Sequence, residues 1–556
     1  MTASLIARDV TVAFGPRVVL DRVSCTVGPD HRIGIVAPNG TGKTTLLEVL
    51  AGRRIPDAGT VTVTPPTATV GYLPQERERR AGETVRAFLA RRTGVAAAEA
   101  ALDETAAALA RGETGADDAY DAALTRYLAL GAADLDSRTE AVCADLGLPD
   151  RVLTAEVAGL SGGEAARVGL AAVLLSRFDV FLLDEPTNDL DFAGIERLER
   201  FVTDELAGGA VIVSHDRSFL DRTITSVLEL DDHDHTASRF EGGWQAYLAE
   251  RATARRHAEE AWADHDARRR DLAGRAQRQQ EWSVQGRAKA KRSGETDKFV
   301  RHHRRSTSEH VAAKARITEK ALERHEAAAV AKPWEGWELR MEIATAPRAG
   351  AVTARSSGLV VHRGDFTLGP IDLQIDHGER VAITGANGSG KSTLLGALLG
   401  RIAPDAGEAR LGPGVVVGTL DQARAAFTGT DSLLDRFSAA TGLTPTEARS
   451  ALAKFGLGAE HVGRPADSCS PGERTRASLA VLTVTGVNCL VLDEPTNHLD
   501  LPAIEQLESA LGGYSGTLVV VTHDRQLLDA VALTRRVALA DGRVISDEPV
   551  GPIGGP

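Results

Sequence analysis

The chain has 556 residues, more than one hydrophobic core usually supports, so we expect two or more domains. Its apolar fraction of 43% is ordinary for a folded protein, and it contains no run of about 18 apolar residues, the length that a bilayer-spanning helix needs. A net charge of −13 by itself argues against a nucleic-acid partner, because phosphate binding needs Lys and Arg.

The N-terminus and the cysteines indicate the compartment. Residues 1–9 lack a basic segment followed by an apolar stretch, so they do not resemble a secretory signal, and we expect a cytoplasmic protein. The cysteines lie far apart without CxxC spacing, which argues against a zinc site and a disulfide framework. We therefore expect reduced, buried thiols at Cys25, Cys143, Cys469 and Cys489.

Near the N-terminus, an apolar strand at Ile33–Val36 leads through a glycine-rich turn into a helix. Glycines let backbone N–H groups converge on phosphate oxygens, and the helix N-terminus adds partial positive charge. This pattern predicts a phosphate loop in which Lys43 contacts the β and γ phosphates and Thr44 binds Mg²⁺. Ala37 stands where a leading glycine is expected, and we expect its methyl group to tighten the turn without preventing nucleotide binding. The residues assigned to this ATP site are Asn39, Gly40, Gly42, Lys43, Thr44 and Thr45.

Two later apolar strands carry polar residues at their carboxyl ends. Val180–Leu183 is followed by Asp184 and Glu185, and Val211–Val213 is followed, after one serine, by His215. We predict that Asp184 orients Mg²⁺ through water and that Glu185 polarises the attacking water.

The same motifs recur in the second half of the chain. The phosphate loop recurs as Gly385–Ser392, the two carboxylates as Asp493 and Glu494, and the histidine as His523. One histidine is more often structural, but two at matched positions favour γ-phosphate contacts for His215 and His523. The second ATP site is assigned to Asn387, Gly388, Gly390, Lys391, Ser392 and Thr393, with Ser392 and Asp493 as Mg²⁺ ligands.

The two copies differ in length. The offset from Lys43 to Lys391 is 348 residues, whereas that from Glu185 to Glu494 is 309, so the first copy has 39 extra residues. They fall near residues 90–150, a stretch rich in Ala, Glu and Asp that predicts helices.

Between the copies, residues 242–332 are rich in Arg, Lys, Gln, Ala, Glu and His, and no proline occurs before Pro333. This composition predicts two long helices, with a turn over Gly286–Gly294. An arm of about 40 helical residues would be about 60 Å long. Residues 268–324 carry 17 Lys or Arg and 7 Asp or Glu, a balance of +10 that leaves −23 for the rest of the chain.

Leu160–Glu164 resembles the signature motif of ABC ATP-binding cassette proteins, and Cys469–Glu473 resembles it with departures at Cys469 and Pro471. The resemblance implies that ATP lies between the phosphate loop of one copy and the signature of the other. Lys43 and Ser470 would then contact one ATP, and Lys391 and Ser161 would contact the other. The signature residues implied to contact ATP are Ser161, Gly163, Ser470 and Gly472.

Other site residues follow from the same resemblance. Gln75 and Gln422 resemble the glutamines that contact both ATP and Mg²⁺ in these cassettes. Phe14 is expected to stack on one adenine. At the second site His362 is the nearest candidate, and no aromatic residue is obvious there.

The whole chain resembles the ABC-F family, which has two cassettes on one polypeptide, no membrane domain and a charged helical linker. The second copy reads Glu-Pro-Thr-Asn-His-Leu-Asp, as in that family, and the first departs from it at Asp189. The resemblance implies an α/β fold with two ABC-type P-loop nucleotide-binding domains, joined by a long α-helical hairpin. The expected boundaries are 1–241, 242–332 and 333–556, and the two cassettes would pair within a monomeric chain.

The resemblance also implies a partner, the 70S ribosome. Family members bind its E-site with ATP and push the linker toward the peptidyl-tRNA and the peptidyl-transferase centre. A basic linker on an acidic body suits an RNA-lined cavity, although charges on such a hairpin can also serve only to keep it solvated. The expected rRNA and tRNA contacts are Arg287, Lys289, Lys291, Arg292, Lys298, Arg301, Arg304 and Arg305.

Several functions remain open from the sequence. Antibiotic resistance by ribosome protection is favoured slightly over a housekeeping role on stalled ribosomes, because high Ala and Arg with few Lys suggest a high-GC bacterium. The ATPase subunit of a drug exporter would not need a basic hairpin of this length. A DNA-associated ABC ATPase would typically have zinc modules or very long coiled coils. The insert near 90–150 is either an arm directed at the ribosomal stalk or an enlarged helical subdomain.

Overall fold

A computed structural model of the chain describes residues 3–74, 80–292, 313–314, 316–318, 320–328, 350–364, 366–469, 471–497 and 499–551. The chain forms two compact units. The larger comprises Met1–Gln245 and Trp337–Pro556, and the smaller comprises Ala246–Gly336. Both copies of the repeated motifs therefore belong to one compact unit.

The first copy, called cassette 1 here, contains two sheets. One has six strands in the order β5-β6-β7-β3-β8-β9, and all its pairs are parallel except β8 with β9. The other is antiparallel, with the order β2-β1-β4. The strands are β1 Ser4–Phe14, β2 Arg17–Val27, β3 Arg32–Val36, β4 Ala58–Thr64, β5 Val70–Leu73, β6 Val180–Asp184, β7 Gly209–Val213, β8 Ser226–Leu230 and β9 Ala237–Glu241.

Strand order brings the predicted site residues together. Every residue of β6 and β7 is buried, as expected for parallel strands covered on both faces, which read as continuous apolar runs. Because β6, β7 and β3 are adjacent and parallel, the carboxylates after β6, the histidine after β7 and the phosphate loop after β3 meet at one edge of the sheet. Ligands of open α/β sheets bind at this edge.

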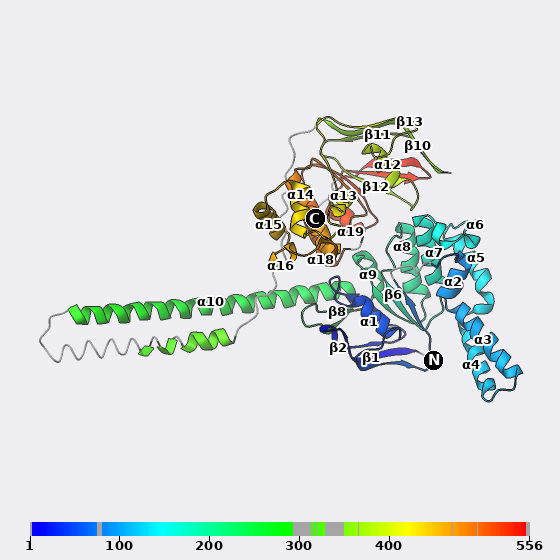
Figure 1. Cartoon of the computed structure of the whole chain (residues 1–556), viewed down its shortest axis with the longest axis horizontal. Coiled ribbons are helices and arrows are strands. Elements are labelled where there is room, and N and C mark those ends of the chain that lie inside the picture. Colours follow the sequence, from blue (N-terminus) through cyan, green and yellow to red (C-terminus); the bar gives the residue numbers. More distant parts are fainter. Residues whose placement is uncertain are drawn as a thin grey trace. The chain divides into compact units, whose positions relative to one another are not determined.

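The helices of cassette 1 include the extra segment. Helices α3 and α4 pack together as a hairpin within the 39-residue excess, as the composition predicted (Figure 1). The bounds are α1 Lys43–Leu50, α2 Val85–Arg92, α3 Val95–Ala110, α4 Ala116–Ala129, α5 Leu135–Asp145, α6 Arg151–Thr154, α7 Gly162–Leu175, α8 Phe192–Arg200 and α9 Arg217–Thr223, with a π-helical continuation of α8 at Phe201–Glu205.

The second copy, cassette 2, repeats both sheets. Their orders are β14-β15-β16-β12-β17-β18 and β11-β10-β13. The strands are β10 Val352–Arg363, β11 Phe366–Asp376, β12 Arg380–Gly385, β13 Ala406–Leu411, β14 Val417–Thr419, β15 Cys489–Asp493, β16 Thr517–Val521, β17 Arg535–Ala540 and β18 Arg543–Pro549. The helices are α12 Lys391–Leu398, α13 Leu420–Ala425, α14 Leu433–Thr441, α15 Pro445–Ala453, α16 Ala459–Val462, α17 Pro471–Thr485, α18 Leu501–Gly512 and α19 Arg525–Ala530.

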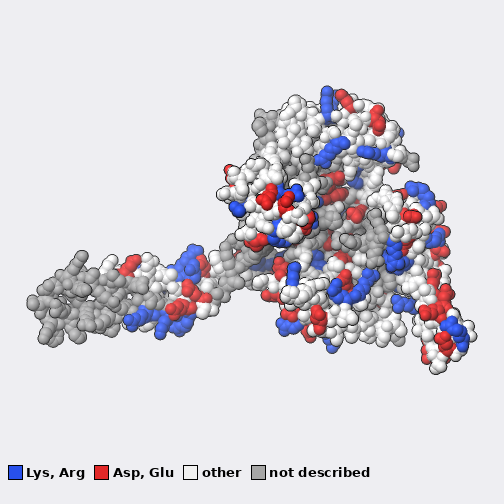
Figure 2. Space-filling model, in the orientation of Figure 1, with Lys and Arg blue, Asp and Glu red and all other residues white. Residues whose placement is uncertain are grey.

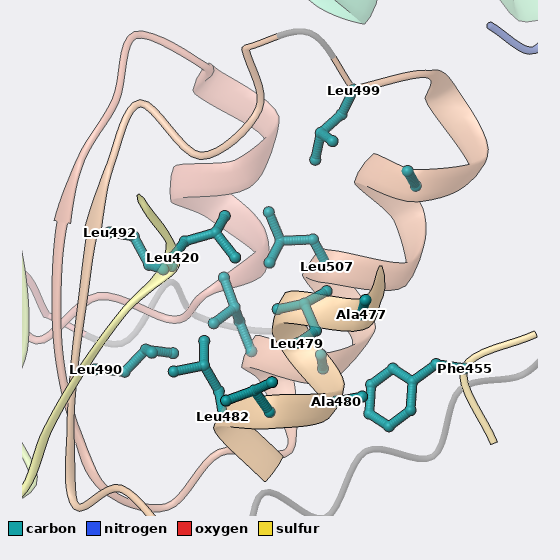
Figure 3. Close-up of a cluster of buried hydrophobic side chains, with 14 of the residues drawn as sticks. Leu420, Phe455, Ala477, Leu479, Ala480, Leu482, Leu490, Leu492, Leu499 and Leu507 are labelled. Carbon is teal, nitrogen blue, oxygen red and sulfur yellow. The ribbon is translucent and has the colours of Figure 1, made fainter. Parts of the chain in front are cut away.

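The core of cassette 2 joins its sheet to the helices beside it. Leucines of β15 pack against apolar side chains of α17 and α18 (Figure 3). Each such leucine contributes roughly 1.5–3 kcal/mol when it leaves water, which fixes the strand that carries Asp493 and Glu494. All four cysteines of the chain are buried free thiols, as the sequence predicted.

The smaller unit consists mainly of α10 (Gly243–Arg292) and helical residues at 316–318 and 320–327. His265 and His325 stack with ring centroids 4.0 Å apart, and each Nε2 lies within hydrogen-bonding distance of the carbonyl oxygen of the other. The two helical segments therefore lie side by side. The predicted fold class, two P-loop domains joined by a helical hairpin, is confirmed.

The expected turn at Gly286–Gly294 is wrong in its first part, because α10 continues through Gly286 to Arg292. A glycine within a helix costs only about 1 kcal/mol relative to alanine, and its Ala, Lys, Arg and Gln neighbours favour helix. The rest of that turn lies outside the described residues. Within the described part of the chain, no helix combines the length and the apolar character needed to cross a membrane.

Candidate nucleotide sites

The phosphate loop of cassette 1 adopts a conformation that only glycines tolerate easily. Gly40 and Gly42 have φ values of 85° and 107°, and a Cβ on Gly42 would lie 2.6 Å from the Val19 side chain. Nζ of Lys43 donates to the carbonyl oxygen of Ala37 at 2.8 Å and to Oδ1 of Asn39 at 3.2 Å. The loop, with Thr44 and Thr45, lines a cavity of about 520 Å³.

The phosphate loop of cassette 2 has the same form. Gly388 and Gly390 have φ values of 84° and 101°, and Nζ of Lys391 donates to the carbonyl oxygen of Gly385 at 2.7 Å. Gly385 itself has φ 147°, and a Cβ there would lie 2.2 Å from a backbone oxygen. Ala37, its counterpart in cassette 1, has no positive φ. The first loop therefore accommodates a methyl group by a different backbone path.

The acidic pair of cassette 1 follows β6 directly. Glu185 has φ 50°, a left-handed conformation that non-glycine residues rarely adopt and that concentrates at functional sites. Its carboxylate accepts from the backbone N–H of His215 at 3.3 Å and lies 3.1 Å from Nε2 of the same residue. Burial raises the pKa of Glu185 to about 7, although Lys43 opposes the shift.

The acidic pair of cassette 2 is similar, and its histidine is different. Glu494 has φ 42°, and burial raises its pKa to about 8 against the opposing charge of Lys391. Nε2 of His523 lies 3.5 Å from Oε1 of Glu494. Burial, together with the charge of Lys391, lowers the pKa of His523 to about 4, so its imidazole is neutral at physiological pH.

Both sites hold a hydroxyl beside a carboxylate, as a Mg²⁺ site requires. Oγ of Ser392 donates to Oδ2 of Asp493 at 2.8 Å, and the Thr44 hydroxyl bonds to Asp184. Burial raises the pKa of Asp184, while the hydrogen bonds from Thr44 and Tyr72 oppose the shift. Mg²⁺ prefers such oxygen ligands and keeps several waters and phosphate oxygens besides. The residues present therefore fit this ion.

Two residues that the sequence reasoning missed connect the cassettes. Oδ2 of Asp191 accepts from the backbone N–H of Asn387 in the second phosphate loop at 3.0 Å, and Oδ2 of Asp500 accepts from that of Asn39 in the first at 3.1 Å. The other oxygen of each aspartate caps its own helix, α8 or α18. The Asn-x-Leu-Asp segment occurs in both copies of the sequence. The sequence did not show that its aspartate contacts the phosphate loop of the opposite cassette.

The first signature also lies at this interface. Ser161 and Glu164 form a capping box at the start of α7, which accounts for the Ser-x-x-Glu spacing of the motif. A Cβ on Gly163 would lie 2.8 Å from Cβ of Asn387, so only a glycine lets the second phosphate loop come this close. A cavity of about 340 Å³ here is lined by both cassettes, with Gly163, Gly388, Glu494 and His523 among its residues.

The residues considered for adenine stacking have different surroundings. Phe14 is 47% exposed and lines the first cavity, and the Arg54 guanidinium lies 4.7 Å from the centre of its ring. His362 bonds to Thr367 through Nδ1. At the second site the aromatic neighbour is Phe366, because a Cβ on Gly390 would lie 3.0 Å from its ring.

Phe366 was missed because the aromatic residue is on the other strand of the hairpin. Phe14 of β1 pairs with Arg17 of β2, whereas Arg363 of β10 pairs with Phe366 of β11. Each hairpin thus has one Phe and one Arg in the same cross-strand pair, with their places exchanged.

Several predicted contacts cannot be placed. Gln75, Ser470, Lys298, Arg301, Arg304 and Arg305 lie outside the described residues, and only the backbone is described for Gln422, Arg287, Lys289, Lys291 and Arg292. Gly472 is buried near the start of α17, and Thr393 is half-buried in α12.

The described part of α10 carries charges of both signs (Figure 2). They pair along the helix, as Arg255 with Glu259 and Arg275 with Asp271, both at 2.9 Å. Pairs at this spacing contribute only about 0.2–0.5 kcal/mol each to a solvated helix. In the sequence, residues 268–292 carry 9 Lys or Arg and 2 Asp or Glu, so most of the +10 predicted for RNA binding lies in α10 itself.

Comparison with known proteins agrees with this geometry. The ABC transporter family pattern matches residues 20–188 and 368–497. The tylosin resistance ATP-binding protein TlrC of Streptomyces fradiae is 38% identical over 543 residues, covering 95% of each chain. The energy-dependent translational throttle protein EttA of Escherichia coli (strain K12) is 32% identical, covering 93% of this chain and 88% of its own.

The fold also matches solved structures. The RNase-L Inhibitor superimposes with a TM-score of 0.54 at 19% identity, covering 96% of this chain and 88% of its own. The chain has two phosphate loops in matching sheets and a long helix between them, and its relatives align over nearly its full length. These observations lead to one assignment. The chain belongs to the ABC-F family of ATP-binding cassette proteins and is an ATPase.

Proposed function

We propose that ATP is hydrolysed at two composite sites, each made by the phosphate loop of one cassette and the signature of the other. The bonds from Asn387 to Asp191 and from Asn39 to Asp500 carry this proposal, because each ties a phosphate loop to the opposite cassette. The close approach of Gly163 to Asn387 supports the pairing of Lys391 with the first signature.

Different side chains have different roles in the hydrolysis of ATP. Lys43 and Lys391 neutralise phosphate charge, and backbone N–H groups of the loops orient the phosphates. Glu185 and Glu494 accept a proton from the attacking water, and the neutral imidazole of His523 donates an N–H to the γ-phosphate. Mg²⁺ would be held by Thr44 with Asp184 or by Ser392 with Asp493, and it would neutralise phosphate charge.

The raised pKa values of the two glutamates predict how activity depends on pH. A glutamate accepts a proton only when it is ionised, and the ionised fraction falls as the pH drops below a pKa of about 7 for Glu185 and about 8 for Glu494. We therefore expect kcat/KM for ATP to rise between about pH 6 and about pH 9, because this parameter reports groups of the free enzyme. The Glu185→Gln variant should shift the midpoint upward, and a flat profile would contradict the assignment.

The position of Phe366 predicts a binding effect confined to the second site. Replacing Phe366 with leucine keeps an apolar side chain against the neighbouring core but removes the ring. Stacking on a base is worth about 1–3 kcal/mol, so KM for ATP should rise by about 5- to 150-fold in a Glu185→Gln background. Phe366→Tyr is the matched control and should keep KM near its original value. An unchanged KM in the leucine variant would place the adenine elsewhere.

We further propose that this ATPase acts on the ribosome and protects it against an antibiotic. The full-length similarity to TlrC, named for tylosin resistance, supports resistance, and the similarity to EttA, named as a translational throttle, supports the ribosome as partner. The net charge of +10 over residues 268–324 suits contact with rRNA and peptidyl-tRNA near the E-site. In this mechanism ATP binding closes the cassettes and inserts the linker, and hydrolysis releases it.

The test is sedimentation of ribosomes from cells that express the Glu185→Gln, Glu494→Gln double variant. Because this variant should bind ATP without hydrolysing it, we expect it to pellet with 70S ribosomes in ATP, to stay in the supernatant in ADP and to arrest growth. The wild-type protein in ATP is the matched control, and it should pellet less because hydrolysis releases it.

The outcomes separate the candidates. A protein that stays in the supernatant, or that fractionates with membranes, would overturn the ribosomal proposal and favour an exporter subunit. If it pellets with ribosomes but a deletion strain shows unchanged antibiotic susceptibility, the housekeeping role suggested by the similarity to EttA replaces resistance.

A further inference from the structure

The catalytic histidine candidate of cassette 2 packs against a ring from cassette 1. Phe192, the first residue of α8, lies edge-on to His523, with ring centroids 5.1 Å apart and an interplanar angle of 77°. Aromatic pairs favour this geometry at this distance. The same phenylalanine packs against the core cluster of cassette 2. Phe192 therefore belongs to cassette 1 in the sequence but packs against the core of cassette 2.

Ion pairs hold the two segments together. Arg525, two residues after His523, lies with its guanidinium 5.7 Å from the ring centre of Phe192. The guanidinium also reaches two carboxylates of α8, Glu196 at 2.7 Å and Glu199 at 3.5 Å. Glu199 is 11% exposed, so water screens this contact less than it screens a surface pair. The start of α8 is thus fixed beside the histidine.

The corresponding position in cassette 2 is a leucine. Leu501 is the first residue of α18 and stands where Phe192 stands in α8. Arg217, two residues after His215, pairs with Glu508 of α18, so the ion pair is kept on this side. A leucine cannot make an edge-on ring contact with His215. The two cassettes therefore differ in the residue that begins the helix after the Asn-x-Leu-Asp segment.

The orientation of His523 depends on packing. Neither ring nitrogen makes a hydrogen bond to any residue within the described part of the chain, and the contact of Nε2 with Glu494 is long, at 3.5 Å. A ring without hydrogen bonds is oriented by the surfaces beside it, and Phe192 supplies one of them. Aligning an N–H donor before the reaction lowers the barrier.

We infer that Phe192 is a positioning residue for the second ATP site: its ring orients the His523 imidazole from the opposite cassette. This inference rests on the proposed roles of Glu494 and His523. It also links turnover at the second site to engagement of α8, because Phe192 reaches His523 only when the two cassettes are together.

The experiment measures ATP hydrolysis by the second site alone, in a Glu185→Gln background. Phe192→Leu places at the start of α8 the residue that α18 has naturally. We expect kcat to fall by about 3- to 10-fold, the range of one aromatic pair, with KM for ATP changed by less than about 2-fold. Phe192→Tyr, which keeps the ring, should retain kcat. Phe192→Met, flexible and without a ring, should behave as leucine does.

The first site supplies the matched control. In a Glu494→Gln background, Phe192→Leu should leave kcat unchanged, and an equal loss there would mean a general structural effect and overturn the inference. An unchanged kcat in the Glu185→Gln background, or a change in KM alone, would overturn it too. If the Glu185→Gln, Glu494→Gln double variant still hydrolyses ATP at the rate of Glu185→Gln, the failure lies in the proposed site instead.

Discussion

Replacing Glu185 and Glu494 together by glutamine is expected to lower kcat for ATP hydrolysis by about 10²- to 10⁴-fold, the usual contribution of a positioned general base. Glutamine has nearly the same shape as glutamate but cannot accept the proton of the attacking water. The lysines and hydroxyls of both phosphate loops stay in place, so ATP should bind with similar affinity. Phosphate release and binding of a fluorescent ATP analogue measure the two effects separately.

The single variants show how the two sites share the reaction. If the sites act independently, each single variant keeps the rate of the other site, whereas obligatory coupling would make either single variant as slow as the double. A double variant that keeps a tenth or more of the original rate would contradict the assignment of both carboxylates. A double variant that fails to bind ATP would show that they hold the nucleotide.

The second large effect is expected from Asp191→Ala combined with Asp500→Ala. Burial opposes ionisation of Asp191, but the backbone N–H groups of Asn387 and Gly194 hold the pKa of its carboxyl below its usual value, so it accepts as an anion. A hydrogen bond to a charged group is worth about 1.5–3 kcal/mol. Since closure of the cassettes uses both aspartates, we expect the rate of ATP hydrolysis to fall by about 10- to 150-fold.

Loss of helix capping has to be separated from loss of the interface. Each alanine also removes an N-cap, which costs about 1 kcal/mol of stability. Thr444→Ala is the control, because Thr444 caps α15 with a capping box away from the site. It removes one N-cap where the double variant removes two, so it should lower the unfolding temperature by about half as much and leave ATP hydrolysis unchanged. Equal rates in the two variants would mean that the aspartates act only as helix caps.

The sequence was sufficient for the parts of the site that depend on neighbouring residues. A phosphate loop is a local structure, since its glycines, its lysine and the start of its helix lie within ten residues or so of one another. Buried strands ending in Asp-Glu or followed by histidine could be read from their apolar runs, and the sheet order then brought them to one edge. The repetition of all these motifs made the two-cassette architecture predictable as well.

Contacts between distant residues were not predictable in this way. The exchange of Phe and Arg between β10 and β11 depends on strand pairing, so the proximity of Phe366 to the second phosphate loop was not visible in the sequence. Helix α10 continues beyond Gly286 because many neighbouring residues favour helix, and one glycine does not end it.

The sequence by itself determined the two P-loop cassettes, the helical linker between them and the charge carried by that linker, because each depends on local pattern or on composition. Only the tertiary structure decided which residues meet across the cassette interface: Asp191 with Asn387, Asp500 with Asn39, and Phe192 with His523. The physical reason is that such contacts join residues hundreds of positions apart. They form only after two independently patterned domains have packed together.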